Sequence, residues 1–197
     1  TITVGADTRI NSDTDNNLFE IASSGNITGT GLDIIFGGTG DIKVDDPINT
    51  GSGGKVTKDG SGELEISAAS NYTGLVTISA GTLTAANNTA LGTIAGGVTV
   101  ASGAILNLRE GITVGNEALA LVGSTLTNET SASWVAGYGG GNTNTYQGVI
   151  TLTGNSTINS DYGTLTINSG GSITSAGNHN LTVGGSGAIN VKDPISI

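Results

Sequence analysis

The sequence predicts an all-β fold, a parallel β-helix in which short strands wind into coils stacked along one axis, with little or no helix. Glycine accounts for 34 of the 197 residues and hydrophobic residues for only 36%, below the roughly 45–50% of average globular domains. Thr and Val favour strands, and Gly and Asn favour turns. The thin core of a solenoid suits this composition better than a compact helical or α/β core.

Short runs with an apolar residue at every second position recur along the chain, and this is the period of a β-strand. Turn residues close each run. The runs are too short for the strands of a sandwich, so we expect coils of roughly 20 residues, spaced about 4.8 Å apart. The clearest runs are residues 62–67, 75–84, 97–108, 148–154, 163–170 and 180–185.

An internal repeat sets the organisation of the chain. The phrase INSD at residues 10–13 returns at 158–161, an offset of 148. The phrase GGTGDIKVDDPI, which ends at Ile48, returns as GGSGAINVKDPI, which ends at Ile195. We therefore predict one elongated solenoid over residues 1–197, with a repeat unit of about 148 residues (1–148) and a partial second copy (149–197).

Charge and composition exclude several classes of protein. The formal net charge is −10, and the six basic residues are scattered singly, so nucleic acids and anionic membranes are not expected partners. The absence of cysteine excludes disulfides and thiolate metal sites. No apolar run approaches the length of a transmembrane helix, so we expect no membrane insertion by this segment.

Two acidic turns are weak candidates for calcium binding. One holds Asp13 and Asp15, and the other holds Asp45 and Asp46. Neither has the full spacing and final Glu of a calcium loop, and ordinary turn chemistry accounts for an acid before proline. We expect no cofactor, with calcium as the alternative.

Catalytic signatures are absent from the sequence. His179 is the single histidine, and it cannot make a zinc site without cysteine or clustered carboxylates. No nucleophile elbow with triad partners is present. We also find no sign of Asp, Arg, Lys and His gathered on one face over successive coils. The chain is therefore predicted not to be an enzyme.

An aromatic stretch lies near the end of the repeat unit, in residues 127–148. It contains Trp134, Tyr138 and Tyr146 among many Gly and Asn residues. One interpretation is an exposed loop whose aromatic rings contact glycans or proteins. The other is a buried tryptophan that plugs an irregular coil.

One segment, KDGSGELEISAASNYTGLVTISAGTLTAANNTALG at residues 58–92, is similar to the passenger-associated transport repeat of autotransporter proteins. Glu63 and Glu65 stand where Thr is commoner in that family. The resemblance implies a right-handed β-helix and a secreted or surface-displayed passenger of a Gram-negative-type bacterium. It associates the motif with passenger folding and export rather than catalysis. The residues that carry the match are Lys58, Gly60, Gly62, Leu64, Tyr72, Gly74, Gly81, Leu83 and Gly92.

These observations together predict a structural or adhesive module. Its role would be that of a rigid rod or of an extracellular filament or sheath unit that assembles end to end, because the open strand edges of a β-helix invite pairing. Expected partners are further copies of the repeat in the same chain, identical subunits, or host and matrix glycans or proteins. The alternatives are a carbohydrate-binding or polysaccharide-degrading β-helix protein and a calcium-stabilised surface binder with flat Thr rows.

Overall fold

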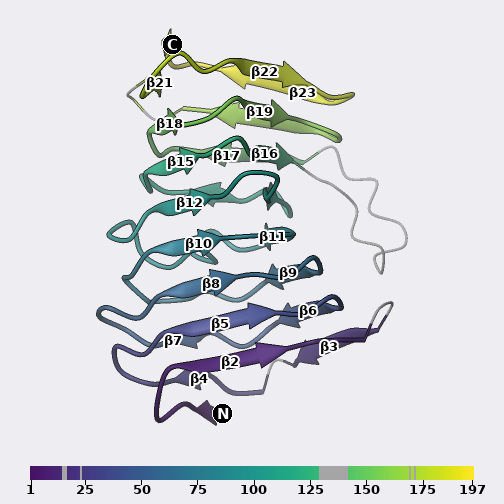
Figure 1. Cartoon of the computed structure of the whole chain (residues 1–197), viewed down its shortest axis with the longest axis vertical. Helices are drawn as coiled ribbons and strands as arrows, with labels where there is room; N and C mark the ends of the chain where they lie inside the picture. Colours follow the sequence, from purple (N-terminus) through teal and green to yellow (C-terminus); the bar gives the residue numbers. More distant parts are fainter. Residues whose placement is uncertain (15–16, 23, 129–141, 169, 171) are drawn as a thin grey trace.

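The computed structural model shows one stack of parallel β-coils (Figure 1). It describes residues 1–14, 17–22, 24–128, 142–168, 170 and 172–197. These described residues form 24 strands and no helix, and so contain no helix able to cross a membrane. The coils make about eight turns, roughly 23 residues apart. This confirms the predicted β-solenoid, with coils slightly longer than expected.

Each coil contributes one strand to each of two long parallel sheets, which we name face one and face two. Face one contains β2 (Thr8–Asn11), β5 (Ile34–Gly37), β8 (Val56–Lys58), β10 (Val76–Ile78), β12 (Val98–Val100), β15 (Leu119–Leu121), β18 (Ile150–Leu152), β21 (Ile173–Ser175) and β24 (Ile195–Ser196). Face two contains β3 (Leu18–Ile21), β6 (Asp41–Val44), β9 (Glu63–Ile66), β11 (Thr82–Ala85), β13 (Ile105–Leu108), β16 (Thr125–Asn128), β19 (Ser156–Asn159) and β22 (Leu181–Gly184).

A third face closes each coil and consists of two short sheets. The first contains β1 (Ile2–Thr3), β4 (Ile27–Thr28) and β7 (Ile48–Asn49), and the second contains β14 (Thr113–Val114), β17 (Thr143–Tyr146), β20 (Thr164–Ile167) and β23 (Ala188–Val191). Backbone hydrogen bonds extend the first sheet toward the second: Asn71 N donates to Ile48 O (3.1 Å) and Thr93 N donates to Tyr72 O (2.9 Å). We treat both sheets as face three.

The core is a narrow column of apolar side chains inside the coils. In face one, Val56, Val76, Val98 and Leu119 pair in register on successive strands, and all are buried. Thr77, between two inward residues of β10, points outward, as the alternation of a strand requires. Because like residues stack on like, a modest number of apolar side chains fills the interior.

The two stretches of repeated sequence lie on different faces. Ile2, Ile27 and Ile48 stack in register on face three, whereas their counterparts Ile150, Ile173 and Ile195 stack in register on face one. Six strands of face one (β2, β5, β8, β10, β12 and β15) separate β1 from β18 along the chain. The second stretch therefore begins six turns and one face beyond the first, with the same local pairing.

Candidate functional site

The residues of the predicted repeat motif build the corner between face one and face two. Lys58 ends β8 with its side chain turned inward and only 1% exposed. Its Nζ donates hydrogen bonds to the carbonyl oxygens of Asp59 (2.9 Å), Gly60 (2.9 Å) and Ala80 (3.2 Å). Because Ala80 lies in the corresponding turn of the next coil, this Lys58 cage ties two coils together.

The buried ammonium of Lys58 is held by carbonyl dipoles and nearby charge. Burial lowers its pKa to about 8, while the negative charge of Asp59, Asp41 and Glu63 opposes that shift. Lys58 is therefore still mostly protonated at neutral pH. A charged donor with three acceptors is the arrangement that a buried ammonium requires.

Glycine is required where successive corners touch backbone to backbone. A Cβ built on Gly62 would lie 2.1 Å from Gly40 O, and one built on Gly81 would lie 2.5 Å from Gly62 O. Gly81 also has a φ of 67°, in the region that favours glycine. The K-D-G-x-G and A-G-T-L phrases thus describe stacked turns.

We expect Gly62→Ala to lower the free energy of unfolding by about 3 kcal/mol or more, because the methyl group would collide with a backbone carbonyl that cannot move independently. The matched control is Gly5→Ala, where an added Cβ meets nothing within 4 Å and the change should stay within about 0.5 kcal/mol. Chemical denaturation of both variants provides the measurement, and equal effects would show that the corners are not tightly stacked.

The remaining motif residues pack the interior of face two and face three. Leu64 and Leu83 pair in register and are fully buried. Tyr72 is also fully buried, and its hydroxyl donates to Ala90 O at 2.8 Å. A Cβ on Gly92 would lie 2.6 Å from the Tyr72 ring, and one on Gly74 would lie 2.5 Å from Gly54 O. Every motif residue named from the sequence thus has a structural role.

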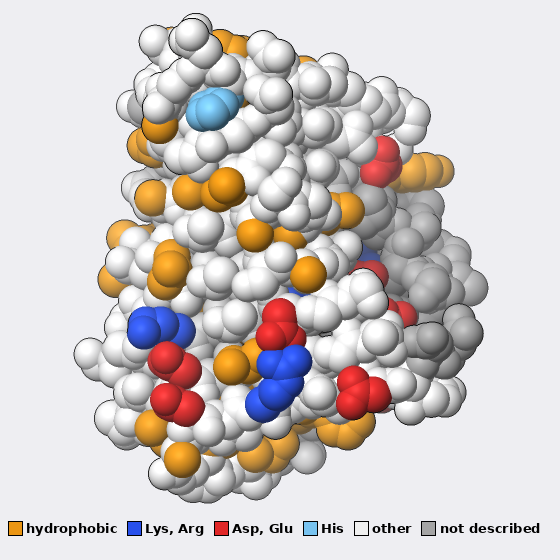
Figure 2. Space-filling view, viewed as in Figure 1, with side chains coloured by type: hydrophobic (Ala, Val, Ile, Leu, Met, Phe, Trp, Pro, Cys, Tyr) orange, Lys and Arg blue, Asp and Glu red, His pale blue; other side chains and the backbone are white. Residues whose placement is uncertain are grey.

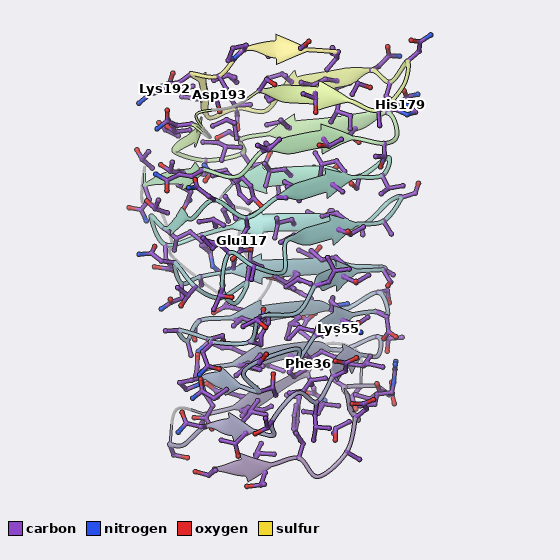
Figure 3. All side chains as sticks on the ribbon, turned by 90° about the vertical axis from the view of Figure 1, so that its left-hand side faces the viewer. Phe36, Lys55, Glu117, His179, Lys192 and Asp193 are labelled. Carbon is purple, nitrogen blue, oxygen red and sulfur yellow. The ribbon has the colours of Figure 1, made fainter. Side chains whose placement is uncertain are left out.

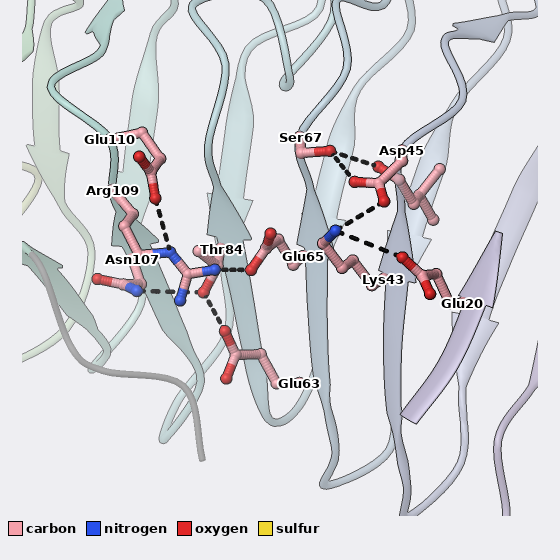
Figure 4. A network of polar contacts seen from close by, with 11 residues as sticks. Glu20, Lys43, Asp45, Glu63, Glu65, Ser67, Thr84, Asn107, Arg109 and Glu110 are labelled. Carbon is pink, nitrogen blue, oxygen red and sulfur yellow. Dashed lines mark hydrogen bonds and ion pairs between the residues drawn. The ribbon is translucent and has the colours of Figure 1, made fainter. Parts of the chain in front are cut away.

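A second cluster runs along the outer side of face two (Figure 4). We name it the polar ladder, and its successive strands contribute Glu20, Lys43, Glu65, Thr84 and Asn107 in register. Its contacts within and beside the row are as follows: Lys43 Nζ lies 3.5 Å from Glu20 Oε1 and 2.6 Å from Asp45 Oδ2, Thr84 Oγ1 donates to Glu63 Oε1 at 2.5 Å, and Asn107 Nδ2 donates to Thr84 Oγ1 at 3.1 Å.

Glu65 of the polar ladder forms a buried ion pair with Arg109, which follows β13. Glu63 lies beside it, and burial raises the pKa of the Glu63 carboxyl. The expectation that no acidic and basic residues gather on one face over successive coils is therefore wrong. Glu65 and Arg109 are 44 residues apart in sequence, and only the correct coil lengths bring them together.

The calcium candidates do not form one site. Asp46 Oδ1 accepts hydrogen bonds from the backbone N–H groups of Ser24 and Gly25, both at 2.9 Å. Asp45 binds Lys43 and accepts a hydrogen bond from Ser67. Asp13 lies within 3.5 Å of Asn11 Nδ2, and Asp15 is outside the described residues. In the described part of the chain, no group of three or more His, Cys, Asp or Glu side chains could hold a metal.

Metal removal tests the role of these acids. We expect the melting temperature to be the same in calcium and in excess EDTA, because Asp45 and Asp46 already accept hydrogen bonds from donors of the protein. A thermal scan of the two samples is sufficient. A melting temperature that falls in EDTA and recovers on adding calcium would instead identify a calcium-stabilised fold.

The predicted aromatic contact loop receives one correction. Trp134 and Tyr138 are outside the described residues. Tyr146 lies in β17, is fully buried, and donates from its hydroxyl to Glu117 O at 3.0 Å. Its assignment to an exposed contact loop is therefore wrong, because alternation in β17 turns it into the core. His179 lies at the surface in the turn between β21 and β22 (Figures 2 and 3).

The Thr rows considered from the sequence are present as short ranks: Thr125, Thr157 and Thr182 stack in register on face two, and Thr143 with Thr164 and Thr145 with Thr166 on face three. Face one carries another rank. Thr57, Thr77 and Thr99 stack in register on the outer side of successive strands. Ala120 interrupts the rank before Thr151. On the side shown in Figure 2, charged side chains gather over the N-terminal coils, while the C-terminal coils show few. Adjacent Thr ranks lie side by side over β17 and β20, but Ala188 and Asn190 end them at β23, so the described strands carry short Thr ranks rather than one long flat row.

Comparison with known proteins identifies the segment that builds the Lys58 cage. A family model described as Passenger-associated-transport-repeat matches residues 56–85, which run from β8 to β11. No curated protein and no solved structure matches the chain. This repeat family implies a secreted or surface-exposed protein. With the repeat at residues 56–85 and a parallel solenoid, the chain fits a passenger β-helix of the autotransporter type.

Proposed function

We propose that this chain is a non-enzymatic structural or adhesive module of a large repeat protein on the outer surface of a Gram-negative-type bacterium. It acts as a stiff rod that places binding regions at a distance from the cell. The observation that carries this proposal is the use of the repeat motif: Lys58, Tyr72 and the motif glycines are all engaged in stacking coils. The polar groups of Lys58 and Tyr72 bond to carbonyl groups of the protein itself, as expected for a structural role.

Stiffness follows from how each coil is held. Every interior strand of face one and face two pairs with the coil on either side, as β10 pairs with both β8 and β12. The contacts of a solenoid are between neighbours along its axis, so the rod transmits load without a separate core domain. Proposed partners are further copies of the repeat, identical subunits, and host or matrix glycans or proteins.

Electron microscopy of the full-length protein, with antibody against this segment on intact cells, tests the proposal. We expect a thin rod of constant width and antibody labelling at a distance from the outer membrane. A compact particle, or labelling only after the cells are broken, would contradict a surface rod.

The polar ladder supports a second candidate function, polysaccharide cleavage. Glu63 and Glu65 are carboxylates on one face, and Arg109 lies beside them. Glycosidases use paired carboxylates of this kind. However, Glu63 accepts from Thr84, and Glu65 pairs with Arg109. Release of reducing ends from a panel of bacterial and host polysaccharides, abolished in Glu65→Gln, would favour the enzyme over the rod.

A further inference from the structure

The C-terminal end of the stack leaves inward-facing apolar side chains without a coil above them. Val183 of β22 and Ile195 of β24 are each 49% exposed, whereas their sequence counterparts Phe36 and Ile48 are fully buried. The strands β22, β23 and β24 therefore form an open edge, which we name the C-terminal edge. Open edges of this kind are templates for another strand.

The structure also contains the equivalent edge of the first copy together with the strands that cover it. In the first copy, β5 and β6 correspond in sequence to β22 and β23, and they are covered by β8 and β9. There, Ile34 pairs with Val56 and Phe36 with Lys58. Ile42 pairs with Leu64 in the same way. Leu181, Val183 and Ile189 occupy the corresponding positions at the C-terminal edge.

The backbone of the C-terminal edge already has the required shape. Gly38 and Gly185 are counterparts in the repeated phrase, and their φ angles are 104° and 111°. A Cβ on either would meet the equivalent carbonyl, Ser12 O at 2.0 Å or Ser160 O at 2.1 Å. In the first copy, Gly60 of the next coil packs directly on Gly38, because a Cβ on Gly60 would lie 2.3 Å from Gly38 O. The corner at Gly185 is thus formed in advance.

We propose that the C-terminal edge is a docking site for a second copy of the repeat unit, starting at its residue 51. Its β8 and β9 would stack on β22 and β23 in the register seen on β5 and β6. The inference rests on the proposed rod, and it names the part of the next unit that continues the rod. Three side-chain contacts of the first copy differ: Asp41 Oδ1 accepts from Glu63 N at 2.8 Å, Asp45 accepts from Ser67, and Arg9 pairs with Asp59. The equivalent residues Ala188, Lys192 and Thr157 cannot make these contacts.

The docked copy would be turned relative to the first. In the first copy, β8 stacks on β5 in face one, whereas at the C-terminal edge it would stack on β22 in face two. Each further unit therefore rotates by one face, and the fourth unit of an array regains the orientation of the first. A partner that recognises one outer surface of the unit would find it on all three sides of the rod.

A fusion protein tests the docking site directly. A second set of residues 51–92 is appended after Ile197, with Thr182→Cys in the parent and Thr57→Cys in the appended segment. The parent chain has no cysteine, and adjacent outward residues of stacked coils are close enough for a disulfide. We expect near-complete disulfide formation in this fusion, and none when Thr77 of the appended segment carries the cysteine, because it would lie one coil further away.

Hydrogen exchange provides the second measurement. Amide exchange in β22 and β23 should slow by roughly tenfold or more in the fusion, and Ile189→Asp should abolish the slowing. Unchanged exchange, or a disulfide with Thr77 and not Thr57, would overturn the proposal. The proposal would also be overturned if the parent protein formed elongated oligomers in which the amides of β22 and β23 exchange slowly. In that case the N-terminal edge of another chain would cover the C-terminal edge. A rod on the cell surface would survive either result, so failure here is separate from failure of the proposed function.

Discussion

Replacing Lys58 with methionine should lower the free energy of unfolding by about 2–3 kcal/mol. Methionine keeps an apolar stem of similar length, but the carbonyls of Asp59, Gly60 and Ala80 lose their charged donor. An unsatisfied buried acceptor costs about 1–3 kcal/mol. Removing the buried ammonium gives back part of this loss, because burial had lowered its pKa to about 8. Because three carbonyl acceptors lose their partner and only one desolvated ammonium is removed, we expect the substitution to be destabilising.

Lys55→Met is the matched control for this substitution. Lys55 is in the preceding turn, its side chain is 57% exposed, and its ion pair with Asp33 is 3.5 Å long. Exposed pairs of this kind contribute little, so we expect a change within about 0.5 kcal/mol. Urea denaturation of both variants at pH 7 gives the comparison. Equal stabilities of the two variants would show that the Lys58 cage does not hold the corner.

Replacing Glu117 with glutamine should change how stability depends on pH. Glu117 lies between β14 and β15, is 2% exposed, and has burial as the cause of a pKa raised from 4.5 to about 8. Among the described residues, its Oε2 has no hydrogen-bond partner. Figure 3 labels this side chain among the middle coils of the stack.

The sign follows from proton binding. The folded state holds the Glu117 proton above pH 4.5, where the unfolded chain has released it, so stability is full below pH 4.5 and falls as pH rises to about 8. The slope is about 1.4 kcal/mol per pH unit, and the total loss is of the order of 3–5 kcal/mol. Glutamine does not titrate, so Glu117→Gln should lack this slope.

Denaturation of wild type and Glu117→Gln from pH 5 to pH 8 measures the effect. Glu63, whose pKa burial also raises, is present in both proteins and cancels in the difference. Lys58 affects the pH dependence only above about pH 8. There the folded state releases the Lys58 proton before the unfolded chain does, so stability rises with pH. Parallel curves for the two proteins would mean that water or a protein donor stabilises the Glu117 carboxylate.

The sequence was sufficient for the fold class because strand alternation and turn residues act locally. The motif residues of the segment around Lys58 and Tyr72 were found through the resemblance to the passenger-associated transport repeat, because close glycine contacts and a buried lysine leave a recognisable sequence pattern. What each motif residue does was not predictable, because the carbonyls that bind Lys58 Nζ include one from the next coil.

Coil length explains most of what the sequence did not reveal. The step from Leu64 to Leu83 is 19 residues, whereas the step from Leu126 to Ile158 is 32. No single period aligns the chain, so the pairing of Arg109 with Glu65 and the burial of Tyr146 could not be read from spacing. The two repeated stretches lie on different faces for the same reason: the repeat unit does not contain a whole number of coils.

Native-state hydrogen exchange across residues 56–85 tests the central claim most directly, that the repeat motif locks neighbouring coils into one rigid stack. The account predicts that the amides of β8, β9, β10 and β11 exchange with one common free energy, equal to that of global unfolding. Exchange of these amides at a much lower free energy than those of β12 and β13 would contradict it, because the motif would then open independently of the rod.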